Sequence, residues 1–167
     1  MKVEVAPAGE PDKAIVANLM QLYLYEFPYI DHLEVGDDGR FTYHYFDRYW
    51  SEEGRYPFLI RAEQRLAGFA LVAERRLLEP GTEGHAMAEF FVLRKYRRRG
   101  IGEAAARVLF EQFPGPWWIA EHAENLAAQT FWRAIIGRYT GGRYTEGPTD
   151  YYGDPAMVQS FDSSAAG

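Results

Sequence analysis

Cysteine is missing from this chain of 167 residues. Its absence excludes disulfides, thiolate metal sites and a covalent cysteine intermediate, and it is typical of a reducing cytoplasm. The chain also lacks an apolar run of membrane-spanning length, and Asp12 and Lys13 interrupt the region where a signal peptide would need one. We therefore expect a cytoplasmic protein without a membrane partner.

Positive charge is scarce outside one short segment. The net charge is −6, yet Arg94, Lys95 and the three arginines at 97–99 place five positive charges within six residues. The rest of the chain is strongly acidic. A nucleic-acid surface would spread basic residues more widely, so we expect a local site for a small polyanion and no nucleic-acid partner.

The basic segment lies between an apolar strand and an amphipathic helix, in the stretch 89–110. Gly100 and Gly102 punctuate the turn and remove the Cβ atoms that would hinder close approach of a ligand. The first amides of a helix lack intrahelical partners and lie at the positive end of the helix dipole, so they attract anions. The sequence therefore predicts a phosphate-binding turn.

Apolar spacing predicts a mixed α/β or α+β domain over residues 1–167, in which 47% hydrophobic residues supply the core. Its sheet is expected to be partly antiparallel. The expected strands are 2–6, 58–62, 66–73, 86–93 and 117–120, and the expected helices are about 10–28, 41–50, 101–113 and 125–136. A closing hairpin of 143–145 and 157–161 is expected around Gly147-Pro148.

The pattern Arg97-x-x-Gly100-x-Gly102 resembles the pyrophosphate loop of the GNAT superfamily of N-acetyltransferases. Val92 fills the hydrophobic position that the family pattern has eight residues before the first glycine. Asn125 and Trp132, after the strand at 117–120, are similar to the family's second acetyl-CoA-binding segment. Asn125 also suits a helix cap and Trp132 suits packing. The resemblance covers roughly 55–137.

This resemblance implies a GNAT-like mixed, mostly antiparallel central sheet of about six to seven strands, splayed at the cofactor site and flanked by about four helices. It implies acetyl-CoA as acyl donor, without a metal. The residues that would contact the donor are Phe91, Val92, Leu93, Arg97, Arg98, Arg99, Gly100, Ile101, Gly102, Asn125 and Trp132.

Glu89 is the candidate general base. It is the only charged residue in 86–93, and burial there would raise the pKa of its carboxyl group. The alternatives are an ion pair with a core arginine such as Arg61, or a carboxylate facing solvent. Glu121 and His122, at the end of the next strand, are rival candidates.

The general acid departs from a common family pattern, which places a tyrosine where this chain has Trp132. An indole N–H donates a hydrogen bond but does not deliver a proton at neutral pH. Tyr139 and Tyr144 are weak candidates, and the thiolate could instead leave toward water.

The acceptor is expected to be a primary amine of a small molecule or a protein, acetylated directly in a ternary complex. Tyr25, Tyr29 and Tyr45 are candidate contacts, because aromatic faces attract ammonium groups. Packing against the sheet is the alternative reading for these tyrosines. A non-catalytic acyl-CoA-binding module is the alternative function, and a homodimer through exposed aromatics is a further possibility.

Overall fold

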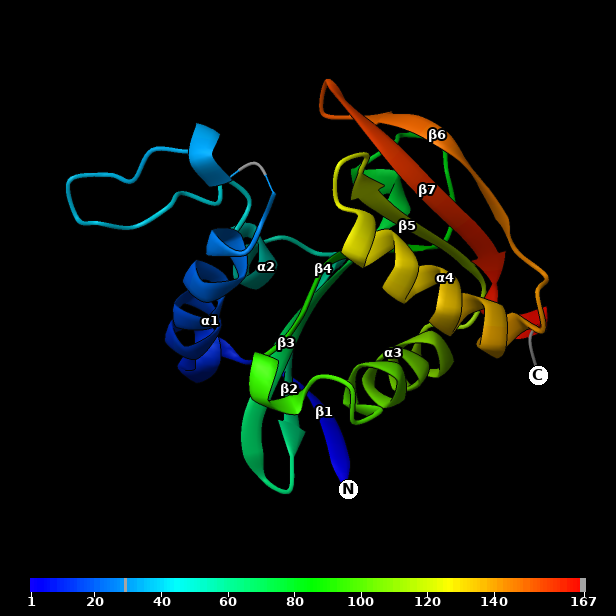
Figure 1. Cartoon of the computed structure of the whole chain (residues 1–167), viewed down its shortest axis with the longest axis horizontal. Coiled ribbons are helices and arrows are strands. Elements are labelled where there is room, and N and C mark those ends of the chain that lie inside the picture. The colour runs from blue at the N-terminus through cyan, green and yellow to red at the C-terminus, as the bar shows by residue number, and fades with distance from the viewer. Residues whose placement is uncertain (29, 166–167) are drawn as a thin grey trace.

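The computed structural model describes residues 1–28 and 30–165, apart from the side chain of residue 31. The elements follow one another along the chain as shown in Figure 1. They are β1 (Val3–Pro7), α1 (Lys13–Tyr25), α2 (Arg48–Ser51), β2 (Arg55–Ala62), β3 (Arg65–Glu74), β4 (His85–Val92), α3 (Ile101–Gln112), β5 (Pro116–His122), α4 (Leu126–Thr140), β6 (Thr145–Tyr151) and β7 (Asp154–Asp162), with short 3-10 turns at Glu10–Asp12, Ile30–His32, Arg75–Leu77, Arg94–Tyr96 and Ser163–Ala165.

The strands form one seven-stranded sheet in the order β1-β2-β3-β4-β5-β7-β6. Neighbouring strands are antiparallel, except that β4 and β5 run parallel. This parallel pair joins His85 to Trp117 and Ala86 to Trp118, and the described strands show no further pairing beyond those positions. The strands therefore diverge toward their carboxyl ends, which confirms the predicted splay.

Helices cover the two faces of the sheet separately (Figure 1). On one face, Leu19 and Met20 of α1 pack with Phe69 and other buried residues of the sheet. On the other face, α3 and α4 pack against Trp117 of β5 in the largest core cluster. Because successive residues of a strand point to opposite faces, the two clusters use alternate positions.

A β-bulge lies in β4 beside the splay. Leu71 of β3 pairs with Glu89, but the next residue, Val72, pairs with Met87, so Ala88 is an extra residue in β4. A bulge of this kind bends its strand and redirects side chains. Glu89 consequently shares the face of Phe91, which packs in the α1 cluster.

The helix predicted over 41–50 is wrong for most of its length, because only Arg48–Ser51 is helical. The side chain of Gln21 explains the difference at Phe41. It accepts from the Phe41 backbone N–H at 2.8 Å and donates to the Phe41 carbonyl at 2.9 Å. A tertiary contact thus satisfies backbone groups that a helix would have paired.

The last helix is longer than predicted. It continues through Gly137 to Thr140 and ends at Gly141, whose φ of 62° suits a left-handed cap. Ile135 and Ile136 are buried in the core, so packing favours helix beyond the predicted end.

The closing hairpin also differs from the prediction. Gly147 and Pro148 lie inside β6, and the turn falls at Tyr152-Gly153, where both φ values are positive. Since β6 is an edge strand, the missing N–H of Pro148 is tolerated there.

None of the helices in the described part of the chain combines the length and apolar character that crossing a membrane requires.

Gly68 supplies a test of the sheet next to the site. A Cβ atom at this position in β3 would lie 1.9 Å from the Phe91 carbonyl oxygen. We expect Gly68→Ala to lower the free energy of unfolding by about 3 kcal/mol, because the backbone of β4 would have to move. Urea denaturation measures this change. Gly147→Ala is the matched control, since its Cβ would meet no described atom within 4 Å; equal stability of the two variants would contradict the expectation.

Candidate active site

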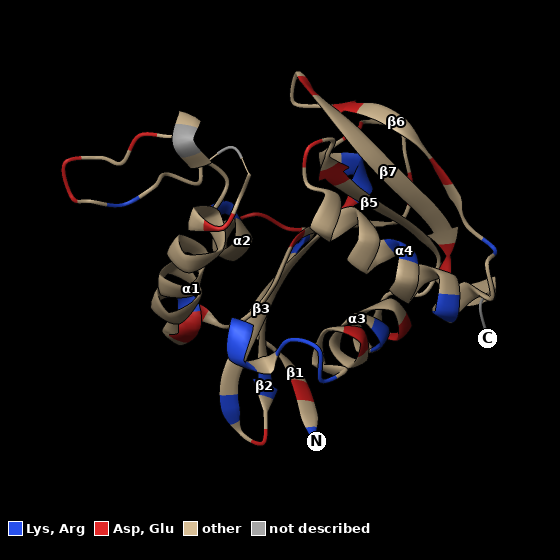
Figure 2. Cartoon of the chain, in the orientation of Figure 1, with Lys and Arg blue, Asp and Glu red and all other residues tan. Residues whose placement is uncertain are grey.

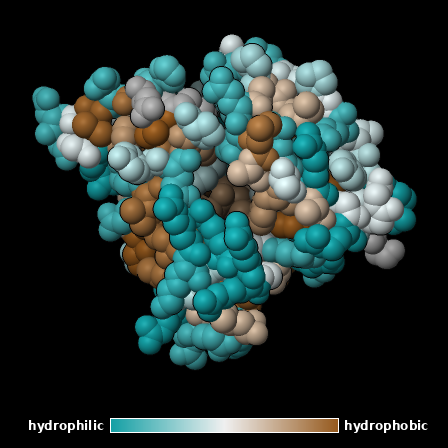
Figure 3. All heavy atoms as spheres, in the orientation of Figure 1, coloured by the Kyte–Doolittle hydropathy of each residue, from teal (hydrophilic) through white to brown (hydrophobic). Residues whose placement is uncertain are grey.

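A cleft of 1250 Å³ lies where β4 and β5 diverge. Its walls come from these strands, the start of α3, one side of α4 and the turn between β6 and β7. Figure 3 shows a recess near the middle of this face, with hydrophilic side chains along its lower edge. Ordinary small-molecule pockets occupy roughly 300–1,000 Å³. This cleft therefore has room for more than one ligand group.

The basic turn forms one end of the cleft. Figure 2 shows that Lys and Arg residues gather between β4 and α3. Arg98 and Gly100 adopt left-handed backbone conformations, with φ of 59° and 76°, and Gly100 is the N-cap of α3. A Cβ at Gly100 would meet no atom of the described chain within 4 Å, so space adjoins the helix start. Consecutive N–H groups in such a turn suit an anion.

Arg97 is already engaged within the turn. Its Nε donates to the Val92 carbonyl at 2.7 Å, and its Nη2 lies 2.5 Å from Glu26 Oε2. Arg94 Nε contacts the other oxygen of Glu26 at 2.8 Å. Arg97 therefore clamps the turn to the end of β4, and an incoming phosphate would compete with Glu26 for it. Arg98, exposed on the wall of the cleft, is the more accessible cation.

Gly102 has a packing role that the sequence did not reveal. A Cβ there would lie 3.0 Å from the Phe131 ring of α4. The glycine thus lets α4 approach the start of α3, and both residues line the cleft. Close packing of the two helices is a sufficient reason for glycine at this position.

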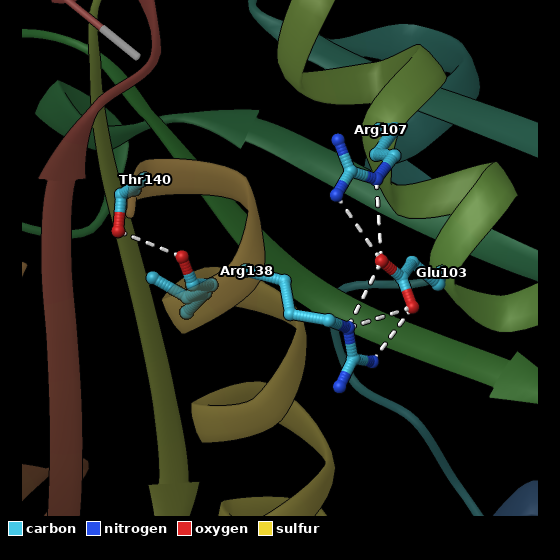
Figure 4. A network of polar contacts seen from close by, with 5 residues as sticks. Glu103, Arg107, Arg138 and Thr140 are labelled. Carbon is cyan, nitrogen blue, oxygen red and sulfur yellow. Dashed lines mark hydrogen bonds and ion pairs between the residues drawn. The ribbon is translucent and has the colours of Figure 1, made fainter. Parts of the chain in front are cut away.

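An ion-pair network joins the two helices at the same end (Figure 4). Glu103 of α3 accepts from Arg138 of α4 at 2.6 Å and from Arg107 at 3.2 Å. These hydrogen bonds, the one from Arg138 foremost, lower the pKa of Glu103. The spacing of Glu103 and Arg107 along one helix could have predicted their pair, but no local pattern indicates Arg138.

Glu89 lies on β4, on the face of the sheet that α1 covers. Burial raises the pKa of its carboxyl group to about 7, although hydrogen bonds from Tyr23 and Tyr43 oppose the shift. Arg61 donates instead to the carbonyl of Gln64. The predicted ion pair with Arg61 is therefore absent, and Glu89 does not lie at a sheet edge, because β4 is an inner strand.

Further tyrosines surround this carboxyl group, and the sequence had not singled them out. Burial raises the pKa of Tyr49 and of Tyr151, and the charge of Glu89 adds to both shifts. Tyr151 ends β6, Tyr152 begins the turn to β7, and both line the cleft with Tyr23. They could not be identified from the sequence because they follow Glu89 by some sixty residues.

Of the three tyrosines that were predicted to contact the acceptor, Tyr45 lies near this end of the cleft. Tyr45 stacks on Tyr152 with ring centroids 5.6 Å apart, which places it beside the cleft wall. Tyr25 is 69% exposed and packs beside Phe41, outside the cleft lining. Tyr29 lies outside the described residues.

Glu121 and His122 line the far wall, at the end of β5. Glu121 is 6% exposed, and burial raises its pKa to about 8. The Nδ1 atom of His122 accepts from the Glu124 backbone N–H at 3.3 Å. Glu121 is thus a rival of Glu89 whose carboxyl pKa is strongly raised.

The second predicted segment forms the rest of this wall. Asn125 caps α4 by accepting from the Ala128 N–H at 3.2 Å, and it also lines the cleft, so capping and ligand contact are compatible. Trp132 lines the cleft while its ring packs 5.1 Å from that of Phe90. Tyr139 and Tyr144 pack against the core cluster and do not line the cleft.

The remaining residues that were predicted to contact the acyl donor fall into two groups. Phe91 and Val92 line the cleft, whereas Leu93, Arg99 and Ile101 do not. Ile101 is fully buried beneath the turn, so its part is to anchor the start of α3.

The fold and this cleft define a class of α/β protein with a basic, glycine-containing turn beside a splayed sheet. The family model described as "Acetyltransferase (GNAT) family" matches residues 17–137. The chain therefore belongs to the GNAT acetyltransferase family. No curated protein sequence matches the chain significantly.

Solved structures share the fold. The ribosomal-protein-S18-alanine N-acetyltransferase of Escherichia coli superposes with a TM-score of 0.64 at 15% identity, covering 99% of this chain and 97% of that one. The aminoglycoside acetyltransferase AAC(6')-Ib in complex with coenzyme A gives 0.65 at 14% identity, with coverage of 98% and 96%. RimL, the ribosomal L7/L12 alpha-N-protein acetyltransferase in complex with coenzyme A, gives 0.64 at 13% identity, with coverage of 99% and 96%. At these identities the likeness shows the fold alone.

The buried carboxyl group of Glu121 makes stability depend on pH. Its pKa rises from 4.5 to about 8 on folding, so the folded chain binds the extra proton between those values. Stability should therefore fall as the pH rises from 4.5 toward 8, by on the order of 4 kcal/mol from this group.

We expect Glu121→Gln to remove that decline, so that the variant is more stable than the parent at pH 9 and about equal to it at pH 5. Urea unfolding across this range provides the measurement. Parallel pH profiles for parent and variant would show that Glu121 is not protonated in the fold.

Proposed function

We propose that the chain is an acetyl-CoA-dependent N-acetyltransferase that moves an acetyl group to a primary amine by direct transfer in a ternary complex. One observation carries the proposal. A half-buried carboxyl group whose pKa is raised to about 7, that of Glu89, lines the same cleft as a helix start suited to an anion.

The donor end of the cleft suits a pyrophosphate joined to an extended arm. The turn around Gly100 offers helix-start amides, and Arg98 offers a cation that can bind phosphate in a bidentate manner. Beyond the turn, the edges of β4 and β5 face each other without pairing, so their backbone groups can bind the amides of a pantetheine arm. Asn125 and Trp132 would border that arm.

The acceptor end suits an amine that must lose a proton. Acetyl-CoA supplies the activated acyl group, and an amine attacks it only in the neutral form. A base works best with a pKa near the working pH, and burial of Glu89 provides this. The hydroxyl groups of Tyr23 and Tyr43 fix the orientation of the carboxylate by hydrogen bonding to it. Direct transfer fits the chain because it has no cysteine to carry the acyl group.

Two classes of acceptor follow from solved structures of the same fold, namely protein amines and aminoglycosides. The acceptor end of this cleft is lined by tyrosines, with Glu89 and Asp154 as its acids. A polycation would find few carboxylates there. We therefore favour a small monoamine or a protein amine over an aminoglycoside as the acceptor. A cytoplasmic location and a homodimer remain predictions.

Calorimetric titration with acetyl-CoA tests the donor. A free-thiol assay with monoamines, peptides with an N-terminal alanine and aminoglycosides then tests transfer. We expect binding of acetyl-CoA and thiol release with at least one amine. Absence of binding would contradict the proposed function. Binding without transfer to any amine would favour a non-catalytic acyl-CoA-binding module, for which Trp132 at the usual tyrosine position is the supporting feature.

The role of Glu89 is tested by Glu89→Gln. The amide keeps the shape of the side chain but cannot take a proton, so kcat should fall by about 100-fold or more while acetyl-CoA affinity stays unchanged. The rising limb of the pH–rate profile near pH 7 should disappear as well. Glu111→Gln, at an exposed position on α3, is the matched control. Parent-like turnover in Glu89→Gln would remove Glu89 from the mechanism.

A further inference from the structure

The turn between β6 and β7 holds a tyrosine in a backbone conformation that tyrosine rarely adopts. Tyr151 pairs with Asp154, so Tyr152 and Gly153 form the whole loop of the hairpin. Their φ values are 52° and 86°. A two-residue loop with positive φ at both positions usually begins with Asn, Asp or Gly, because a bulky side chain is strained there. The turn itself gains nothing from a tyrosine, so the reason for the ring lies in its contacts.

The ring of Tyr152 contacts two other tyrosines. It stacks on Tyr45 with the ring centroids 5.6 Å apart and an interplanar angle of 26°. It meets the ring of Tyr151 edge-on at 4.6 Å, and Tyr151 lies beside Trp118 of β5 at 5.6 Å. Aromatic pairs in such geometries attract each other beyond the effect of the surface they bury. Ring contacts therefore hold the tip of this hairpin against the rest of the protein.

Tyr45 is a firm support for the stack. It precedes α2, and the guanidinium groups of Arg48 and Arg55 lie 5.1 Å and 5.6 Å from the centre of its ring. Arg55 is only 8% exposed, and its Nε binds Glu52 at 2.6 Å. Tyr152, in contrast, is 58% exposed. One ring of the stack thus rests on a buried cation, and the other is brought to it by the hairpin.

The stack joins the two halves of the splayed sheet. The neighbours of Tyr45 in sequence, Tyr43 and Phe46, pack with α1, whereas Tyr152 belongs to the hairpin at the opposite edge of the sheet (Figure 1). Tyr43 also forms a hydrogen bond with Glu89, and Tyr152 and Glu89 line the same cleft. The stack therefore crosses the acceptor end of the cleft beside the candidate base.

A crossing at this place discriminates between the two favoured classes of acceptor. A polypeptide with its amine at Glu89 needs an open path by which the rest of its chain leaves the cleft. A small amine needs no such path, because the cleft can enclose it entirely. Tyrosine faces beside one carboxylate also suit a single ammonium group on a short apolar body.

We propose that the Tyr45–Tyr152 stack determines acceptor specificity, restricting transfer to small primary amines and excluding protein amines. This inference rests on the proposed function and narrows it. Tyr152 acts through the position of its ring, which bars the path of a polypeptide, and it takes no part in bond making. The strained turn persists because the ring provides this barrier.

Two matched pairs of acceptors test the inference with the full chain and acetyl-CoA. Alaninamide is compared with a hexapeptide amide that begins with alanine. Butylamine is compared with a hexapeptide that has a blocked N-terminus and a single lysine, whose side chain carries the same amine. Free-thiol release gives kcat/KM for each compound, and the ratio of small amine to peptide is the measured quantity. Calorimetry shows whether each variant binds acetyl-CoA as the parent does.

We expect the parent to favour the small amine by about 100-fold or more in at least one pair. Tyr152→Asn keeps a residue that suits the turn but removes the ring, so the ratio should fall by about 10-fold or more. Tyr45→Leu should have a similar effect, and the double variant should lower the ratio no further, because both changes open the same barrier. Tyr25→Asn, at an exposed tyrosine outside the cleft lining, should keep the parent ratio.

Equal kcat/KM for both members of each pair in the parent would overturn the inference and leave the proposed function intact. So would an unchanged ratio in Tyr152→Asn, because a tyrosine that serves only the hairpin changes the turnover of a small amine and its peptide alike. Turnover of neither small amine would also overturn it, since the enclosed end should admit both. If acetyl-CoA does not bind, the proposed function fails and the inference fails with it.

Discussion

The site depends on the early end of pairing between β4 and β5. The two strands share two positions of parallel pairing and then separate, so the centre of the sheet is open on one side. Strand edges that would otherwise bind each other are left for a ligand, because backbone N–H and C=O groups need partners when buried. The bulge at Ala88 lies beside this opening and orients Glu89 into the cleft.

The opening also divides the cleft into two electrostatic environments. At one end, an uncapped helix start and surface arginines provide positive potential, and the Glu103–Arg138 pair holds the two helices together. At the other end, burial dominates and raises the pKa values of Glu89 and Glu121 toward neutrality.

Local patterns were sufficient to predict two of the segments that line the cleft. The turn at 97–102 and the segment from Asn125 to Trp132 are continuous in sequence, and their functional groups are largely backbone amides, whose positions follow from the elements themselves. The strand that carries Glu89 was also predicted, because its apolar run contains a single charge. The splay was predicted through the family resemblance.

Groups that meet across long sequence separations could not be predicted. Glu26 engages Arg97 from 71 residues away, and Tyr151 joins the surroundings of Glu89 from the closing hairpin. The burial of Glu121 depends on its neighbours in β6, β7 and α4, none of which shows in the pattern of β5. The helix at 41–50 was predicted too long for a similar reason, since the side chain of Gln21 holds Phe41 outside a helix.

The central claim is that the splay and the basic turn together hold coenzyme A. Chemical-shift mapping of ¹⁵N-labelled protein during titration with coenzyme A tests it most directly. We expect the largest amide shifts along 90–93, 98–103 and 119–125, with little change in β1 or in the exposed half of α1. Shifts confined to other surfaces, or an unchanged spectrum at saturating ligand, would contradict it.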